Sequence, residues 1–144
     1  MGISRKATAR WQGDLKSGSG SISTPDSGLM QDTRYGFNTR FGSDKGTNPE
    51  ELIAAAHAGC FTMALANELA QAGHPADSVD TRAEVDLSTD GGPTLSAIRL
   101  VTRAKVPGID EVKFREIADG AKENCPVSRA LGAVPITLEA ELQN

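Results

Sequence analysis

The two cysteines are the residues of this chain best suited to chemistry, and they stand in different local sequences. Cys60 lies within an alanine-rich stretch, where it is either an ordinary core residue or a nucleophile that needs a nearby cation, because burial raises a thiol pKa. Cys125 is followed by Pro126, which places it at the N-cap of a helix, where backbone N–H groups favour the thiolate. A thiol of low pKa is a good leaving group in disulfide exchange. Cys125 is therefore either a resolving cysteine or a buried cap residue.

His57 precedes Cys60 by three residues, so both side chains would lie on one side of a helix. That spacing leaves open a Cys–His pair for hydrolysis and a pair of metal ligands. Neither hypothesis finds a third ligand or a base-orienting residue at a usable spacing. The sequence also lacks a C-x-x-C motif and a phosphate-binding glycine loop. We therefore predict no metal and no cofactor.

The composition indicates an acidic globular protein. Of the 144 residues, 38% are hydrophobic, and 15 basic against 19 acidic residues give a net charge of −4. This content is too apolar for a disordered chain. Because no basic cluster is present to neutralise phosphates, we predict no nucleic-acid partner. Two cysteines are too few for a disulfide scaffold.

The first residues and the longest apolar stretch bear on location. Residues 1–6 lead into polar sequence without the apolar core of a secretory signal. The apolar stretch over residues 52–69 is interrupted by His57, Asn67 and Glu68, so we expect no membrane span. These features favour the reducing cytoplasm, where a disulfide would be transient and catalytic rather than structural.

A long helix is predicted for the middle of the chain. Asn48 can act as its N-cap, and Pro49 suits the first helical position. Glu51, three residues after Asn48, suits the return arm of a capping box. Apolar residues then recur at helical spacing, which puts Cys60 in mid-helix near the buried side. We expect the helix to run to about Gln71 and Gly73 to end it.

The rest of the chain reads mainly as strands. Alternating apolar residues and turn signals predict strands or extended segments over residues 7–11, 18–24, 35–41, 78–87, 94–106 and 135–142. Asp110 can cap a second helix, and a further short helix is expected over residues 127–131. The resulting order, β-β-β-α-β-β-α-α-β, predicts one α+β domain over residues 1–144.

Two motifs around the cysteines resemble those of the OsmC/Ohr family of thiol peroxidases. The run GTNPEELIAAAHAGCF over residues 46–61 is similar to the first cysteine motif of that family, and NCPVS over residues 124–128 is similar to the second. WQGDL at residues 11–15 and YGFNTRF at residues 35–41 resemble the branch called osmotically inducible protein C more than the organic hydroperoxide resistance branch. The resemblance spans essentially the whole chain.

This resemblance implies a fold and an activity. It implies antiparallel sheets packed on a long central helix that carries the first cysteine, in an intertwined homodimer. It implies a cysteine-based peroxidase of the oxidative or osmotic stress response, which reduces organic hydroperoxides to alcohols, and hydrogen peroxide more weakly, without metal or haem. By similarity, Cys60 is the peroxidatic and Cys125 the resolving cysteine, and a dithiol, a lipoyl-type protein in characterised members, reduces their disulfide. Arg40 and Glu50 match the family's arginine and glutamate.

Physical arguments give Arg40 and Glu50 roles of their own. Arg40 can hold Cys60 as a thiolate and donate to the peroxide oxygens, and Glu50 can orient Arg40 through a bidentate pair. Ten residues separate Glu50 from Cys60, which is about 15 Å of rise on an unbroken helix. We therefore expect Glu50 to serve the Cys60 of a second copy across a two-fold axis, with the chain of origin of Arg40 left open.

Two alternatives belong to other functional classes. In the first, the chain is a non-catalytic, stress-induced structural or ligand-binding protein whose thiols merely pack. In the second, Cys60 and His57 form a thiol hydrolase. Thiols no more reactive toward hydroperoxide than free cysteine would favour the first, and thioesterase activity that is lost in His57→Ala would favour the second.

Overall fold

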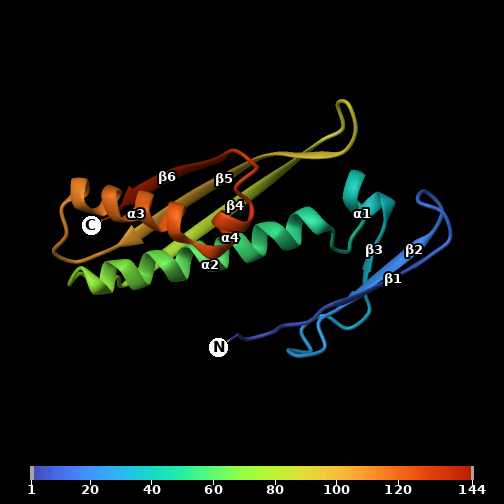
Figure 1. The fold of residues 1–144 in the computed structure, drawn as a ribbon, viewed down its shortest axis with the longest axis horizontal. Helices are drawn as coiled ribbons and strands as arrows, with labels where there is room; N and C mark the ends of the chain where they lie inside the picture. Colours follow the sequence, from blue (N-terminus) through green and yellow to red (C-terminus); the bar gives the residue numbers. More distant parts are fainter. Residues whose placement is uncertain (1, 144) are drawn as a thin grey trace. The chain divides into compact units, whose positions relative to one another are not determined.

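The computed structural model describes residues 2–143, and the chain divides into two compact units, one that ends at Leu52 and one that begins at Ile53. The first unit holds β1 (Thr8–Gln12), β2 (Ser19–Ser23), β3 (Thr33–Tyr35), the short helix α1 (Phe37–Phe41) and the start of α2 (Pro49–Gln71) (Figure 1). The second unit holds the rest of α2 and then β4 (Ser78–Ser88), β5 (Thr94–Lys105), α3 (Glu111–Asn124), α4 (Pro126–Ala130) and β6 (Ile136–Leu142). The single domain over residues 1–144 stays a prediction.

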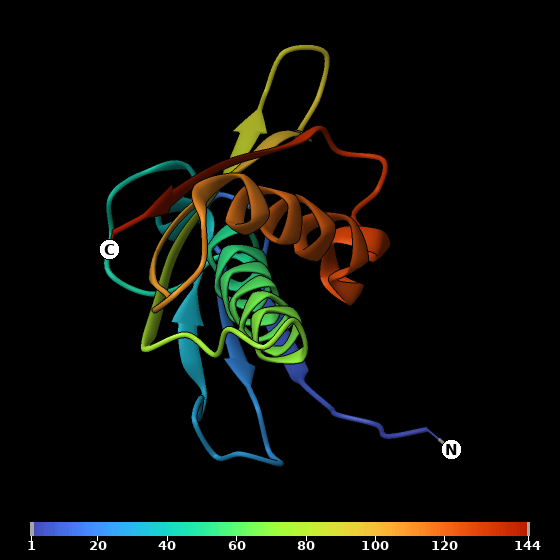
Figure 2. The same cartoon turned by 90° about the vertical axis from the view of Figure 1, so that its left-hand side faces the viewer.

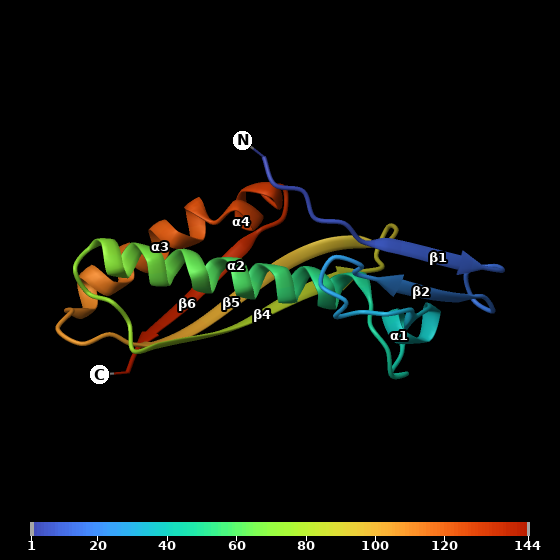
Figure 3. The ribbon, with the colours of Figure 1, turned by 90° about the horizontal axis from the view of Figure 1, so that it is seen from below.

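In the first unit, β1, β2 and β3 form an antiparallel sheet in that order, and Figure 3 shows β1 and β2 side by side. Gly20 in β2 lies between Trp11 and Tyr35 on the neighbouring strands. A Cβ atom at Gly20 would lie 2.5 Å from the Trp11 ring and 2.6 Å from the Tyr35 ring, so this position requires glycine. The two rings meet edge to face, with centroids 5.5 Å apart.

The segment after β3 differs from the prediction. A strand or extended loop was expected over residues 35–41, but Phe37–Phe41 is helix α1. The Thr39 hydroxyl accepts from the Gly36 N–H at 2.7 Å and donates to the Gly36 carbonyl at 3.0 Å, which closes one turn. The four-residue spacing then stacks Phe37 on Phe41, with centroids 4.9 Å apart. Aromatic residues are typical of strands, and this local hydroxyl bond outweighs that tendency.

The predicted ends of α2 are confirmed. The Asn48 side-chain oxygen accepts from the Glu51 N–H at 2.8 Å, and Pro49 is the first helical residue. The Glu51 carboxylate accepts from the Thr47 hydroxyl at 3.1 Å, so it binds the residue that precedes the N-cap. At the other end the helix stops at Gln71, and Gly73 adopts φ +86°, the left-handed conformation that follows many helices.

In the second unit, β5 is the middle strand of a three-stranded sheet. It pairs antiparallel with β4 and parallel with β6, so the expectation of antiparallel sheets is wrong for β6. The reason is the connection: α3 and α4 lie between β5 and β6 and carry the chain back to the end of the sheet where β5 began.

The core of the second unit lies between this sheet and its helices. Alternate residues of β5 point inward, and α2 and α3 lie side by side (Figure 2), where the Asn124 side chain donates to Glu68 at 3.4 Å. One cluster joins the three elements through fully buried or nearly fully buried side chains: Phe61, Leu65, Leu69, Leu100, Ala104, Phe114, Ala118, Ala121 and Cys125. Cys125 is thus a member of the core of the second unit, together with Phe61, Leu65 and Leu69 of α2.

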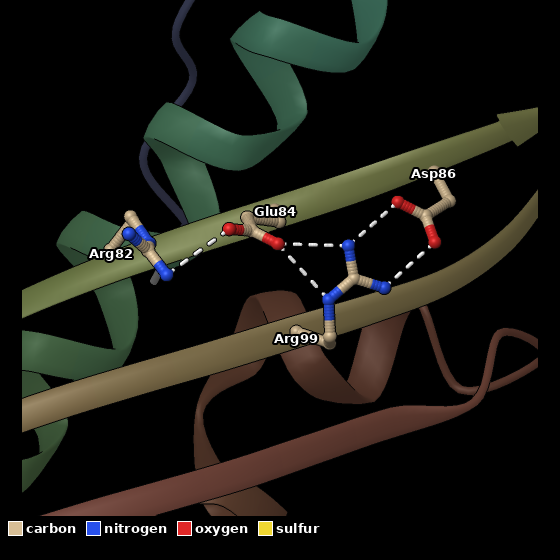
Figure 4. A network of polar contacts seen from close by, with 4 residues as sticks. All are labelled: Arg82, Glu84, Asp86 and Arg99. Atoms are coloured by element: carbon tan, nitrogen blue, oxygen red, sulfur yellow. Dashed lines mark hydrogen bonds and ion pairs between the residues drawn. The ribbon is translucent and has the colours of Figure 1, made fainter.

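Charged side chains line one stretch of the β4–β5 hairpin (Figure 4). The Arg99 guanidinium donates to Glu84 at 2.8 and 3.0 Å and to Asp86 at 2.7 and 2.9 Å, and Arg82 contacts Glu84 at 3.2 Å. Hydrogen bonding to Arg99 lowers the pKa of the Asp86 carboxyl. Because Glu84 and Arg99 are direct cross-strand partners, the network reinforces the register of the hairpin.

By length and composition alone, α2 is apolar enough to cross a membrane, and it is the one helix in residues 2–143 that passes this test. Its buried residues Phe61, Leu65 and Leu69 belong to the core of the second unit. The helix is therefore a core helix of a folded unit, which agrees with the prediction that it is not a span.

Candidate active site

The two cysteines come together in the second unit. Cys60 is on α2 and partly exposed, whereas Cys125 is fully buried and is the N-cap of α4, with Pro126 at the first helical position. Both are free thiols, and Cys60 packs against the core cluster that contains Cys125, so each thiol influences the pKa of the other. Solvent therefore reaches Cys60, whereas Cys125 is shielded from it.

The surroundings move the pKa values of the two thiols in opposite directions. Burial raises the pKa of the Cys60 thiol, and its hydrogen bond with Cys125 raises it further. Burial also acts to raise the pKa of Cys125, but the hydrogen bonds from Cys60, from Ser128 and from the backbone of Val127 outweigh it and lower that pKa. None of the influences on Cys60 is a cation. Within this unit Cys125 is the better thiolate, and Cys60 still lacks the positive charge that would make it a nucleophile.

The first unit contains the ion pair of Arg40 and Glu50. Arg40, at the end of α1, donates through Nε at 3.0 and 3.1 Å and through Nη2 at 2.6 Å to the Glu50 carboxylate in the first turn of α2. The Glu50 side chain is 10% exposed and the Arg40 side chain 33%. This bidentate pair fixes the guanidinium plane. Among the described residues Arg40 donates through Nε and Nη2 alone, which leaves Nη1 to donate to a ligand.

Aromatic side chains surround this guanidinium. Arg40 lines a pocket of about 170 Å³ together with Trp11, Tyr35, Phe37 and Phe41. The Arg40 guanidinium carbon also lies 5.5 Å from the centre of the Phe41 ring. The pocket offers an apolar molecule one wall of rings and one cation. The sequence analysis did not predict this pocket, because Phe37 and Phe41 share α1 with Arg40 whereas Trp11 and Tyr35 come from β1 and β3.

His57 is fully buried and contacts α4. Its Nε2 lies 2.6 Å from Oγ of Ser128, and within residues 2–143 its Nδ1 has no hydrogen-bond partner. Neither ring nitrogen therefore bonds to Cys60, as a Cys–His hydrolase would need. Residues 2–143 contain no group of three or more His, Cys, Asp or Glu side chains that could hold a metal ion.

Known proteins resemble this chain over its full length. A family model described as OsmC-like protein matches residues 42–139. Peroxiredoxin OsmC of Escherichia coli (strain K12) is 49% identical over 145 residues, which cover 100% of this chain and 100% of that protein.

Solved structures share the fold. The organic hydroperoxide resistance protein OhrB of Bacillus subtilis gives a TM-score of 0.70 at 29% identity and covers 94% of this chain and 98% of its own. The OsmC like protein from Mycoplasma pneumoniae gives a TM-score of 0.71 at 20% identity, covers both chains fully, and shows the fold alone.

The fold is therefore the OsmC-like α+β fold, in which sheets pack on a long helix. That helix carries the partly exposed Cys60, and Cys125 belongs to the core cluster beside it. This chain belongs to the OsmC family. The family predicted from the two cysteine motifs is confirmed. The identity of 49% to Peroxiredoxin OsmC, against 29% to OhrB, favours the branch predicted from residues 11–15 and 35–41.

Proposed function

We propose that this chain is a thiol-dependent peroxidase that reduces organic hydroperoxides to alcohols, and hydrogen peroxide more weakly, in the response to oxidative or osmotic stress. One observation carries the proposal: a partly exposed Cys60 packs against the core cluster that contains a buried Cys125. The names of the relatives, Peroxiredoxin OsmC and Organic Hydroperoxide Resistance Protein OhrB, support the same activity.

The chemistry follows from the unequal exposure of the two sulfurs. The Cys60 thiolate attacks the terminal peroxide oxygen, the O–O bond breaks, and the alkoxide takes up a proton and leaves as the alcohol. Cys60 is then a sulfenic acid. Cys125 attacks that sulfur, and the sulfenic oxygen leaves as water. The resulting Cys60–Cys125 disulfide prevents further oxidation of Cys60 and is reduced by a dithiol.

Arg40 and Glu50 of a second copy supply the charge that Cys60 lacks. On α2, Glu50 is ten residues before Cys60, about 15 Å of helical rise, and Arg40 is bound to Glu50 of its own chain. The ion pair therefore moves as one group, so both residues act in trans if either does. A two-fold dimer with antiparallel α2 helices would bring this pair to the partner's Cys60. Arg40 would then stabilise the thiolate and donate to the peroxide, with Glu50 as its positioning residue.

The same proposal assigns partners and location. The functional unit is a homodimer, each chain being one domain over residues 1–144, and the reductant is a dithiol of the lipoyl type. The two free cysteines suit the reducing cytoplasm. No nucleic acid, membrane, metal or cofactor takes part.

The aromatic pocket predicts a preference for apolar peroxides. Because Phe41 forms part of the pocket wall, Phe41→Ala is expected to raise KM for cumene hydroperoxide about five- to tenfold, the equivalent of about 1–1.4 kcal/mol of lost contact. KM for hydrogen peroxide should not change. Leu29→Ala is the matched control, because Leu29 is in the same unit, 85% exposed and outside the pocket. Equal effects on both peroxides would contradict a binding role for the ring.

Intact mass spectrometry tests the central proposal. Reduced protein is treated with one equivalent of cumene hydroperoxide and quenched without reductant. We expect each chain to lose two hydrogens, and peptide mapping to join Cys60 to Cys125. A protein whose thiols remain reduced, while free cysteine in the same tube is oxidised, would favour the non-catalytic alternative.

A further inference from the structure

A buried hydrogen bond runs beside the cysteine pair and joins the same two helices. His57 is three residues before Cys60 on α2, and Ser128 is three residues after Cys125 on α4. His57 is fully buried, Ser128 is 6% exposed, and Nε2 lies 2.6 Å from Oγ. The two helices therefore meet through the packed cysteine pair and, about one turn away, through a polar contact between the imidazole and the hydroxyl.

The surroundings of His57 select its protonation state. Burial lowers the pKa of the imidazole and so favours the neutral ring. Nδ1 has no partner among the described residues. A hydrogen on Nδ1 would leave a buried N–H donor unpaired, whereas a hydrogen on Nε2 is donated to Ser128 Oγ. The Nε2–H tautomer is therefore the one that uses the donor of the ring.

This tautomer fixes the direction of the next hydrogen bond. When Oγ of Ser128 accepts from Nε2–H, its own hydrogen is free to point at Cys125, the N-cap of the same short helix. The side chain and the backbone of Ser128 are both among the groups that lower the pKa of the Cys125 thiol. A chain of hydrogen bonds, Nε2–H to Oγ–H to Sγ, follows, and each bond polarises the next.

The charged side chains near Cys125 do not influence its pKa as Ser128 does. On α2 the titratable group that faces it is the Cys60 thiol. Lys122, Glu123 and Arg129, from the end of α3 and from α4, line a surface pocket that Ser128 also lines, and Glu68 of α2 accepts from Asn124. None of these four is among the influences on the Cys125 pKa.

We propose that His57 and Ser128 are positioning residues that stabilise the anionic form of the Cys125 sulfur through this chain of hydrogen bonds. In the peroxidase cycle, on whose assignment this consequence rests, the Cys125 thiolate attacks the sulfenic sulfur of Cys60. A sulfur–sulfur bond forms, the sulfur–oxygen bond breaks, and the hydroxide takes up a proton from solvent to leave as water. Cys60 is reduced from the sulfenic state and Cys125 is oxidised. This chain of hydrogen bonds from His57 through Ser128 to Cys125, here called the relay, acts on the second step. The first attack, by Cys60 on the peroxide, does not require it.

A thiolate titration tests the relay without any peroxide. The chain has two cysteines, so Cys60→Ser leaves Cys125 as the single thiol and keeps a hydroxyl in place of the Cys60 thiol. The absorbance of the thiolate at about 240 nm is followed against pH, which does not require reagent access to the buried sulfur. Adding Ser128→Ala or His57→Leu is expected to raise the midpoint by about one pH unit, a tenfold loss of thiolate at fixed pH.

The rescue variant separates positioning from packing. His57→Gln keeps an N–H donor near the place of Nε2, and its midpoint should stay close to that of the parent, whereas His57→Leu keeps the volume but not the donor. Circular dichroism checks the fold, and Ser128→Ala carries the test if His57→Leu does not fold. An unchanged midpoint in Ser128→Ala, or equal midpoints in His57→Gln and His57→Leu, would overturn the relay. A failure to turn over peroxide would refute the proposed function and leave this titration intact.

Discussion

Cys60→Ser is expected to reduce the turnover of cumene hydroperoxide to the rate of the blank, whereas Cys125→Ser should retain one oxidation per chain and then stop. The physical reason is the unequal position of the two sulfurs. Cys60 is the partly exposed one, and a serine hydroxyl there neither ionises near neutral pH nor forms a sulfenic acid. Cys125 is fully buried, so a peroxide in solution meets it second.

The two variants should also differ in their products. Without a resolving thiol, the Cys60 sulfenic acid of Cys125→Ser should gain a second and a third oxygen as the peroxide excess rises. Wild-type protein should instead lose two hydrogens and gain no oxygen. Because Met63 is 75% exposed and can itself take up oxygen, the Cys60→Ser protein, which retains Met63, is the matched control for each mass.

A stopped-flow experiment with a dithiol assay measures both effects. Full turnover by Cys60→Ser would refute the assignment of the peroxidatic cysteine. Full turnover by Cys125→Ser with an equimolar dithiol would mean that the external thiol attacks the sulfenic acid directly, and would remove Cys125 from the cycle.

Local signals in the sequence were sufficient where one segment determines its own structure. The cap at Asn48, the stop at Gly73 and the cap at Asp110 each depend on residues within about one helical turn, and each is found as predicted. Cys125 is also the N-cap of α4, as predicted from Pro126, and its side chain makes no capping hydrogen bond. These predictions need no knowledge of what the helix packs against.

The predictions failed where two local tendencies compete, or where the structure depends on residues far apart in the chain. For α1, the intrinsic preference of aromatic residues for strands competes with a single hydroxyl bond at Thr39, and pattern alone cannot weigh the two. For β6, the direction of the strand depends on where the chain emerges from α3 and α4. That position is set by the packing of the whole unit. His57 and Ser128 are 71 residues apart, so no local pattern pairs them. The equal three-residue offsets from the two cysteines were the one available hint.

The Arg40–Glu50 pair sharpens the prediction about the dimer. The sequence analysis expected Glu50 to act in trans and left the chain of Arg40 open. Because Arg40 donates to Glu50 of its own chain at 2.6 Å, the two residues are expected to serve the same Cys60. Glu50 is 8% exposed, so removing Arg40 alone would leave a nearly buried carboxylate unpaired and destabilise the fold. The double variant Arg40→Gln/Glu50→Gln removes both charges together and avoids that cost.

Mixing this double variant with Cys60→Ser should restore activity that neither protein has alone. In a mixed dimer, one site combines the Cys60 of the double variant with the Arg40–Glu50 pair of the Cys60→Ser chain. If subunits assemble at random, half of the dimers are mixed and each has one intact site, so about a quarter of wild-type activity is expected. Sites built from one chain would give no activity in the mixture. The measurement is peroxide turnover after the two proteins are unfolded and refolded together.

The triple variant Cys60→Ser/Arg40→Gln/Glu50→Gln gives the complementary result. When it is refolded in excess with wild type, a site shared between chains has either no Cys60 or no Arg40–Glu50 pair, so the activity per wild-type chain should fall toward zero. A site complete within one chain would keep its full activity in the same mixture. Recovery in the first mixture and loss in the second have one common explanation, because only a site that takes its cysteine from one copy and its cation from the other is sensitive to both.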